Sequence, residues 1–405
     1  MEIIENLRVW QFLAMALFSD INDTIAQEKS NQMNQDFSTE IQFDYRYFLN
    51  KGLYEGQKSH FLSISIQPEY ELDWEDGNQN LKVTLFGRWD QHDQNRTHFD
   101  IRELYYQKVK GDWELSIGAK KIFWGVTESN HLVDIINQTD QVESFDGEQK
   151  LGQPMVHFSI FKNFGTFDLF YMPYARKRQF PAENGRLRFP VVIERDDLPV
   201  DSDLKQWYPS FAARWSHYFG PMDIGVSNFY GVGREPLFLD IASENPQIFY
   251  PIINQTGVEL QAITGVFLWK VEGIYRYAEQ QDFVALTAGF EYTFGNIAST
   301  GLDIGIISEY LYDSRDELAL SSLDNDIFVG SRFALNDAQS TALLIGAIFD
   351  LEHSTRLYSI EGSRRLGNSW KVELEGRFFQ NISEREFLYF FREDSFLQFR
   401  LAKFF

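Results

Sequence analysis

The chain has 405 residues, of which 16% are aromatic, and a formal net charge of −22 at pH 7. It has no cysteine, which excludes disulfides, thiolate metal ligands and a cysteine nucleophile. The negative charge argues against nucleic acid and anionic membrane surfaces as partners. No uninterrupted apolar run of about 18 residues occurs, which excludes a membrane-spanning helix.

The first 26 residues are predicted to be a signal peptide of unusual charge. Trp10 to Phe18 would form its apolar core, and Thr24 to Ala26 a cleavage site of small residues. Acidic residues stand where positive charge is expected, so a misassigned start or a short helix is the alternative. Residues 27–37 are expected to be a short segment before the first strand.

Alternating polar and apolar residues predict about eighteen β-strands, with sixteen as the alternative number. Each is close to the roughly 9 to 11 residues that a membrane strand needs. The predicted ranges are 38–48, 60–73, 80–91, 98–109, 112–124, 153–163, 166–175, 208–219, 221–231, 254–264, 266–278, 282–294, 301–313, 325–335, 339–350, 354–365, 368–380 and 394–405.

The connections between these strands alternate in length. Tight links such as Lys110–Gly111 and Gly220–Pro221 separate long ones, which are 125–152, 176–207, 232–253, 314–324 and 381–393. Short turns at one end and long loops at the other are typical of an up-and-down membrane barrel, whereas a soluble β-sandwich gives no reason for the alternation. We therefore expect an all-β protein with one antiparallel barrel domain over 38–405.

The alternating faces assign charge to the inside of the barrel. In 368–380, Trp370 and Leu374 face one way while Glu373 and Arg377 face the other. A charge on the lipid face costs about 2 to 4 kcal/mol near the bilayer midplane, so the charged faces should line a lumen. The lumenal candidates for solute selection are Lys82, Arg88, Glu103, Lys120, Arg214, Glu259, Lys270, Glu272, Arg276, Glu291, Glu309, Arg332, Lys371, Glu373, Glu375, Arg377 and Arg400.

These mixed charges allow two interpretations. A wall of one sign would predict selectivity, whereas interleaved signs favour a lattice of cross-strand salt bridges that makes the wall rigid. Both interpretations stay open for each residue.

Two stretches resemble known outer-membrane proteins. The last ten residues, Phe396 to Phe405, end on an aromatic residue and resemble the C-terminal signature that the barrel-assembly machinery reads at Phe405. Residues 102–140 resemble an uncharacterised family of outer-membrane porin-like barrels with the pattern R-E-x-Y, then W-G, then D-x-x-N-x-x-D, although Gln138 stands where that family often has proline. The matching loop positions, which are candidates for a constriction, are Trp124, Gly125, Asp134, Asn137 and Asp140.

The resemblance implies an outer membrane protein of a Gram-negative bacterium, in contact with lipid and lipopolysaccharide. By analogy with porins, loop 125–152 folds into the lumen, and an ordinary external loop is the alternative. The implied function is passive diffusion of small hydrophilic or anionic solutes. An export conduit for polysaccharide or lipid with periplasmic partners, and a non-conducting adhesion or scaffold barrel, are the alternatives. A homo-oligomer is left open.

Signals for catalysis and cofactors are thin. His157 and Ser159 form a bare H-x-S pair, which is a weak sign of a lipase. The seven histidines have no metal-ligand spacing. We therefore expect no enzyme activity, no cofactor and no metal.

Overall fold

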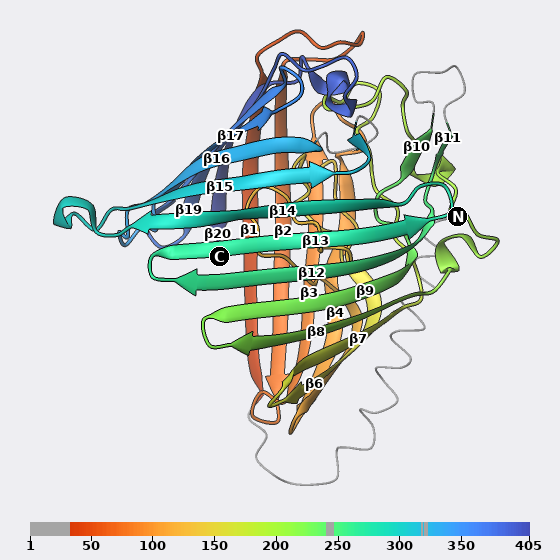
Figure 1. Ribbon diagram of the computed structural model, residues 1–405, viewed down its shortest axis with the longest axis vertical. Helices are drawn as coiled ribbons and strands as arrows, with labels where there is room; N and C mark the ends of the chain where they lie inside the picture. Colours follow the sequence, from red (N-terminus) through yellow and green to blue (C-terminus); the bar gives the residue numbers. More distant parts are fainter. Residues whose placement is uncertain (1–32, 240–246, 317–318, 320–322) are drawn as a thin grey trace.

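The computed structural model describes residues 33–239, 247–316, 319 and 323–405. Within this part of the chain, eighteen antiparallel strands form one closed sheet, because the first strand pairs with both the second and the last (Figure 1). The strands are β1 (Asn34–Phe48), β2 (His60–Trp74), β3 (Gln79–Asp90), β4 (His98–Lys110), β5 (Trp113–Lys120), β6 (Gln153–Lys162), β7 (Gly165–Met172), β8 (Ser210–Phe219), β9 (Met222–Val232), β12 (Ile252–Thr264), β13 (Phe267–Ala278), β14 (Phe283–Phe294), β15 (Asp303–Asp313), β16 (Asn325–Ala334), β17 (Ala342–Asp350), β18 (Arg356–Leu366), β19 (Trp370–Gln380) and β20 (Phe396–Phe404).

This barrel confirms the predicted fold class and its strand number of eighteen. The short elements lie in the connections: a separate pair of strands, β10 (Leu237–Leu239) and β11 (Gln247–Phe249), and single 3-10 turns. These turns are η1 (Arg195–Asp197), η2 (Lys205–Trp207), η3 (Ile297–Ser299) and η5 (Phe387–Phe391). In the described part of the chain, no helix is both long and apolar enough to cross a membrane.

Many strand ends differ from the sequence prediction by one to four residues, and three of these differences have a clear place in the argument. β1 begins at Asn34 rather than at residue 38, and the proposed signal peptide over 1–26 lies outside the described residues. β5 ends at Lys120, not at residue 124, because the next residues turn toward the barrel axis. β7 ends at Met172, not at residue 175, because Pro173 has no N–H to continue the ladder.

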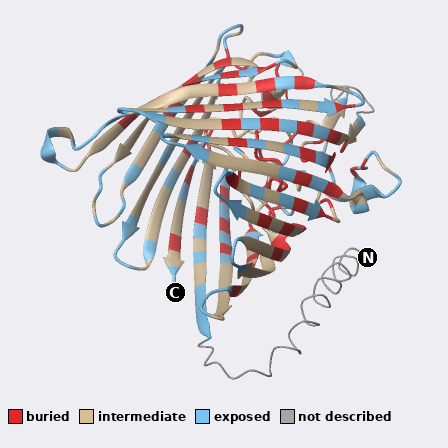
Figure 2. Cartoon of the chain, turned by 60° about the horizontal axis from the view of Figure 1, so that its bottom comes forward, coloured by how far each residue is buried: buried red, intermediate tan, exposed pale blue. Residues whose placement is uncertain are grey.

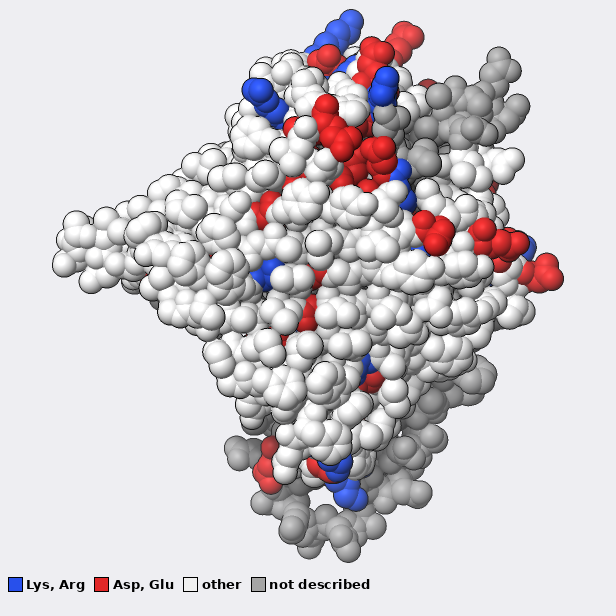
Figure 3. Space-filling model, in the orientation of Figure 1, with Lys and Arg blue, Asp and Glu red and all other residues white. Residues whose placement is uncertain are grey.

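The two faces of the wall differ as the alternation requires. Large apolar side chains point outward, including Trp89 with 55% of its surface exposed, whereas Glu272 on an inner face is fully buried. The outer face over β12–β16 is almost free of charge, and charged side chains gather mainly at its margins (Figure 3). The outer surface therefore suits hydrocarbon, and the inner surface suits water and ion pairs.

The connections confirm the predicted asymmetry of the two ends. At one end lie short turns, such as 111–112 and 220–221, together with the start of β1 and the end of β20. The other end carries the long connections 121–152, 173–209, 233–251 and 381–395. Buried residues concentrate toward the end with the long loops, while the tips of the short turns are exposed (Figure 2).

Two apolar clusters fill the half of the barrel that carries the long loops. The first lies inside the wall and includes Trp124, Ile136, Phe170 and Phe229. The second packs loops against each other over the mouth, and we call it the aromatic roof; it includes Phe180, Phe189, Phe238, Phe387, Leu388 and Phe391.

Candidate functional site

The connection 121–152 between β5 and β6, here called the constriction loop, lies inside the barrel. Ile136 at its centre is fully buried and belongs to the cluster formed with wall residues Phe170, Phe229 and Ile274. Trp124 is 5% exposed and meets the ring of Phe170 edge-on at 5.6 Å. The loop therefore crosses the lumen instead of extending into solvent.

Two wall carboxylates hold the tip of the constriction loop on the far side of the lumen. Glu309 of β15 accepts the N–H groups of Glu128 and Ser129 at 2.8 Å each, and the Ser129 hydroxyl at 2.5 Å. Glu272 of β13 accepts the N–H groups of Val126 at 2.7 Å and Thr127 at 3.0 Å. Buried carboxylates that accept several backbone hydrogen bonds make strong, directional contacts, so the tip is fixed to β13 and β15.

Asn137 joins the two ends of the constriction loop. Its side-chain oxygen accepts the N–H of Ile122 at 2.8 Å. Its amide nitrogen donates to the carbonyls of Lys120 at 2.9 Å and Leu151 at 2.8 Å. This is why β5 stops at Lys120: the next backbone groups bond to Asn137 and not to β6.

The other loop positions selected from the sequence are also structural. Asp134 pairs with Lys150 at 3.1 Å within the loop. Gly125 has a φ of +142°, and a Cβ there would lie 3.1 Å from both Glu272 and His131. Asp140 binds Arg102 of β4 at 2.6 Å, which connects the D-x-x-N-x-x-D stretch to the R-E-x-Y stretch.

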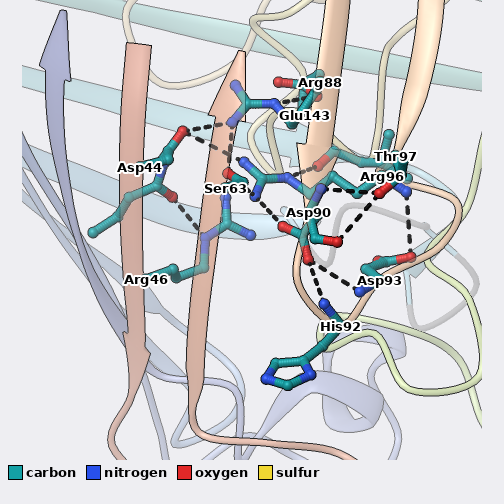
Figure 4. A network of polar contacts seen from close by, with 12 residues as sticks. Asp44, Arg46, Ser63, Arg88, Asp90, His92, Asp93, Arg96, Thr97 and Glu143 are labelled. Carbon is teal, nitrogen blue, oxygen red and sulfur yellow. Dashed lines mark hydrogen bonds and ion pairs between the residues drawn. The ribbon is translucent and has the colours of Figure 1, made fainter.

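A buried ionic network fixes the remaining part of the loop to β1–β3 (Figure 4). Glu143 of the loop pairs with Arg88 at 2.8 Å, and Arg88 also pairs with Asp44 of β1 at 2.9 Å. Arg96, in the connection after β3, reaches Asp90 at 2.7 Å. Burial would raise the pKa of Glu143, but Arg88 and Arg96 outweigh it and lower this pKa, which keeps the loop carboxylate ionised.

The remaining lumenal candidates form a lattice of ion pairs. Each of the basic residues predicted to face the lumen has an acidic partner within 4 Å. Beyond Arg88, these pairs are Lys82–Glu103, Lys120–Glu114, Arg214–Glu259, Lys270–Glu291, Arg276–Glu235, Arg332–Glu291, Lys371–Glu373, Arg377–Glu375 and Arg400–Glu375.

These ion pairs differ in their access to water. The side chains of Arg88 and Glu272 are 4% and 0% exposed. The side chains of Arg332 on β16 and Lys371 on β19 are 40% and 37% exposed, and Glu361 on β18 is 46% exposed. The wet part of the lumen is therefore on the side of β16–β19, which β20 alone separates from the wall that carries the buried network.

A cavity of about 760 Å³ lies above the constriction loop, and its lining extends to Arg332 and Glu361 on this wet wall. The aromatic roof supplies Phe189 and Phe391 to the same cavity. Next to it, burial would raise the pKa of Glu235, but Arg315 and Arg276 outweigh it and lower this pKa to about 2. The cavity thus has an aromatic side and a charged side.

Several residues that fix the loop were not selected from the sequence. They include Asp44, Arg96, Glu143 and Asp146, of which Asp146 pairs with Arg377. Arg234 is 4% exposed and donates to the carbonyl of Ile136 at 2.9 Å, which adds a further contact to the loop. Most of them stand in connections, where alternation gives no signal.

The H-x-S pair does not form a nucleophile relay. His157 Nε2 contacts both Ser159 and Asp168 at 3.0 Å, and its Nδ1 is buried without a hydrogen-bond partner among the described residues. A serine relay needs the hydroxyl and the carboxylate on different ring nitrogens. Within the described ranges, no three acidic or histidine side chains are grouped so that they could hold a metal ion.

The C-terminal residue lies at the end with the short turns. Phe405 exchanges backbone hydrogen bonds with Thr39 of β1, at 3.0 and 3.4 Å, and its side chain is 67% exposed. The predicted recognition of Phe405 during assembly stays a prediction.

Comparison with known proteins defines the class of this barrel. No protein-family model matches the sequence, and no curated protein matches it. Solved structures do match: Pseudomonas aeruginosa OccK2 (OpdF) has 12% identity and a TM-score of 0.54 over 92% of this chain and 97% of that one. P. aeruginosa OpdQ has 10% identity and a TM-score of 0.53 over 92% and 97%. A BenF-like porin from P. fluorescens Pf-5 gives 10% and 0.53 over 92% and 98%.

The chain therefore has the fold of the porin-like β-barrels of the Gram-negative outer membrane. At these identities the likeness concerns the fold alone. It confirms the architecture that the sequence resemblance implied, and it does not test the R-E-x-Y or D-x-x-N-x-x-D patterns.

Proposed function

We propose that the protein is an outer-membrane diffusion channel for small hydrophilic solutes, with a preference for anions. The observation that carries this proposal is the division of the lumen. The constriction loop is held against β1–β9 and β13–β15 by buried contacts. Its ion pairs with β16 and β19, Glu128–Arg332 and Asp146–Arg377, lie instead on a wall where Arg332 and Glu361 stay exposed to water beside a cavity of about 760 Å³.

The geometry favours a narrow passage over a wide pore. A loop fixed at Glu272, Glu309, Arg102 and Arg88 does not move aside without losing several buried contacts. Solutes would therefore pass beside the Arg332–Glu128 pair, which joins the loop to β16, one hydrated molecule at a time. The rigid lattice elsewhere would keep the passage at constant size.

The preference for anions is supported by the charge of the cavity lining. Seven lysine and arginine side chains and seven carboxylates line it. Burial lowers the pKa of His131, but its contacts to Glu148 and Glu272 outweigh this and raise it to about 10. His131 therefore adds a positive charge at neutral pH, which leaves a small positive excess.

Planar-bilayer recording on refolded protein tests this proposal. We expect steady single-channel conductance and a reversal potential that indicates anion preference under a salt gradient. Replacement of the exposed Arg332 (R332A) should shift selectivity toward cations. The matched variant R214A removes an arginine whose side chain is only 20% exposed in its pair with Glu259, so it should leave selectivity nearly unchanged.

The complete absence of current at every voltage and pH would instead support the non-conducting barrel. A current of equal selectivity in R332A and the unaltered protein would remove the anion preference but keep the channel.

A further inference from the structure

A group of carboxylates lies at one side of the mouth of the barrel, beside the aromatic roof. Asp326 at the start of β16 and Asp350 at the end of β17 are cross-strand neighbours that face the lumen. Asp324 in the preceding connection and Glu386 in segment 381–395 interact electrostatically with both of them. Of the groups that most affect the pKa of Glu386, His353 has the opposite sign and lowers it.

Glu386 is the most confined member of this group. It is 4% exposed, and its Oε1 accepts a hydrogen bond from the Thr355 hydroxyl. Its Oε2 is buried and has no hydrogen-bond partner among the described residues. Ionisation of this carboxyl would leave a buried, charged oxygen without a hydrogen-bond partner near Asp350 and Asp324, which is costly.

Segment 381–395 connects this group to the roof of the cavity. It is fixed at its start, where the Ser383 N–H donates to Thr355 Oγ1 at 3.0 Å next to Glu386. A few residues later, Leu388 and Phe391 pack into the aromatic roof with Phe189 and line the cavity. Glu386 therefore directly precedes η5, which carries two of the side chains that cover the mouth.

We propose that Glu386 is a proton-operated latch, which holds segment 381–395 over the mouth when it is protonated and releases it when it ionises. The inference rests on the proposed channel function, because it adds control of access to that passage. Ionisation would place a further negative charge beside Asp350 and Asp324, and repulsion would drive the segment outward with Leu388 and Phe391.

The direction of the pH response follows from the environment of Glu386. Burial, and after it Asp350 and Asp324, outweigh the Thr355 hydrogen bond and His353 and raise the pKa of Glu386 from 4.5 to about 7. The closed form binds the proton more tightly than the open form, so low pH favours closure. The ratio of closed to open should fall tenfold per pH unit between 4.5 and 7, about 300-fold in all, and stay constant above this range.

Bilayer recording with pH varied only on the side of the long loops tests the latch. The unaltered channel should open as the pH rises from 4.5 to 7. E386Q, which mimics the protonated acid, should stay closed throughout. The control E384Q removes the same charge from an exposed residue of the same segment, and should titrate like the unaltered channel. An E386Q channel that opens with pH as the unaltered one does would overturn the latch.

A second readout is independent of current. The chain has no cysteine, so the buried Leu388 can be replaced (L388C) and labelled from the loop side with a membrane-impermeant maleimide. Maleimide reacts with the thiolate, so every cysteine is labelled faster as the pH rises. We therefore divide the labelling rate of L388C by that of K51C, in which the cysteine stands at an exposed position. A corrected rate that rises between pH 4.5 and 7, and is flat when E386Q is added, supports the latch even if no current flows and the channel proposal fails.

A corrected rate of L388C labelling that is independent of pH contradicts the latch. The channel could also close with millimolar Ca²⁺ at fixed pH and show no response to pH. This outcome would mean that the carboxylates bind a cation, and it would contradict the latch.

Discussion

Arg102 and Asp140 form a buried ion pair, 2.6 Å long, between strand β4 and the constriction loop. Both side chains are at most 5% exposed, and Arg102 lies over the ring of Phe86 at 4.4 Å. This contact joins the R-E-x-Y pattern on a wall strand to the D-x-x-N-x-x-D pattern in the loop, so the two belong to one structural unit.

Replacement of Asp140 should destabilise the barrel strongly. In D140A the guanidinium of Arg102 keeps only the more distant Asp100, at 3.4 Å. Loss of one partner from a buried pair costs about 3 to 5 kcal/mol, and we expect the lower end of this range. The free energy of unfolding in urea, measured in lipid vesicles, checks this. The exposed pair Asp112–Lys162 provides the control, and D112A should leave that free energy unchanged.

Replacement of Glu309 should free the tip of the constriction loop. In E309A, three donors of Glu128 and Ser129 lose their acceptor, and each unsatisfied buried donor costs about 1 to 3 kcal/mol. We expect higher and noisier single-channel conductance. E291A removes the same charge from a wall residue that bonds to basic side chains instead of the loop backbone. Equal conductance in both variants would show that charge, and not docking of the loop, sets the conductance.

Replacement of Asn137 should open the two ends of the loop to protease. N137A removes one acceptor and two donors that join Ile122, Lys120 and Leu151. Trypsin should then cleave at Lys121 or Lys150 in the folded barrel, at least tenfold faster if the lost contacts shift local opening by about 1.4 kcal/mol. N336A, in an exposed turn at the other end, should not change the rate. Protection of the loop in N137A would mean that the apolar cluster alone holds it.

Docking of the constriction loop should weaken at alkaline pH. The contacts of His131 with Glu148 and Glu272 outweigh burial and raise its pKa to about 10. A raised histidine pKa gives stability that is complete below about pH 6.5 and is lost as the pH rises through 10, by about 1.4 kcal/mol per unit within this window. Urea unfolding from pH 6 to 10 should show this slope, and H131A should reduce it. A slope that H131A leaves unchanged would assign it to other groups.

The strands of the wall were predictable because lipid outside and water inside impose a period of two on each of them. All eighteen barrel strands lie within the ranges expected from that pattern, apart from shifts at their ends. Where β5 ends could not be predicted, because the backbone after Lys120 bonds to Asn137, which is remote in the sequence. β10 and β11 were missed because three-residue strands show no measurable alternation.

For the candidate site, the types of residue could be predicted from the sequence, whereas their contact partners depend on the fold. The mixed signs of the lumenal residues left a lattice and a selectivity filter open. The alternation also assigns Arg332 and Arg214 to the same class, although the first side chain is 40% exposed and the second 20%. Exposure depends on where the loop lies. Glu143 and Arg96, which hold it there, stand in connections without any periodic signal.

The pairing of β1 with β20 means that the cylinder is joined along a single seam between its first and last strands. A nascent polypeptide that stops before β20 would expose two unpaired backbone edges, which hydrocarbon does not tolerate. Integration into the bilayer is thereby conditional on full translation of the final hairpin, and prematurely terminated products should remain available to periplasmic proteases.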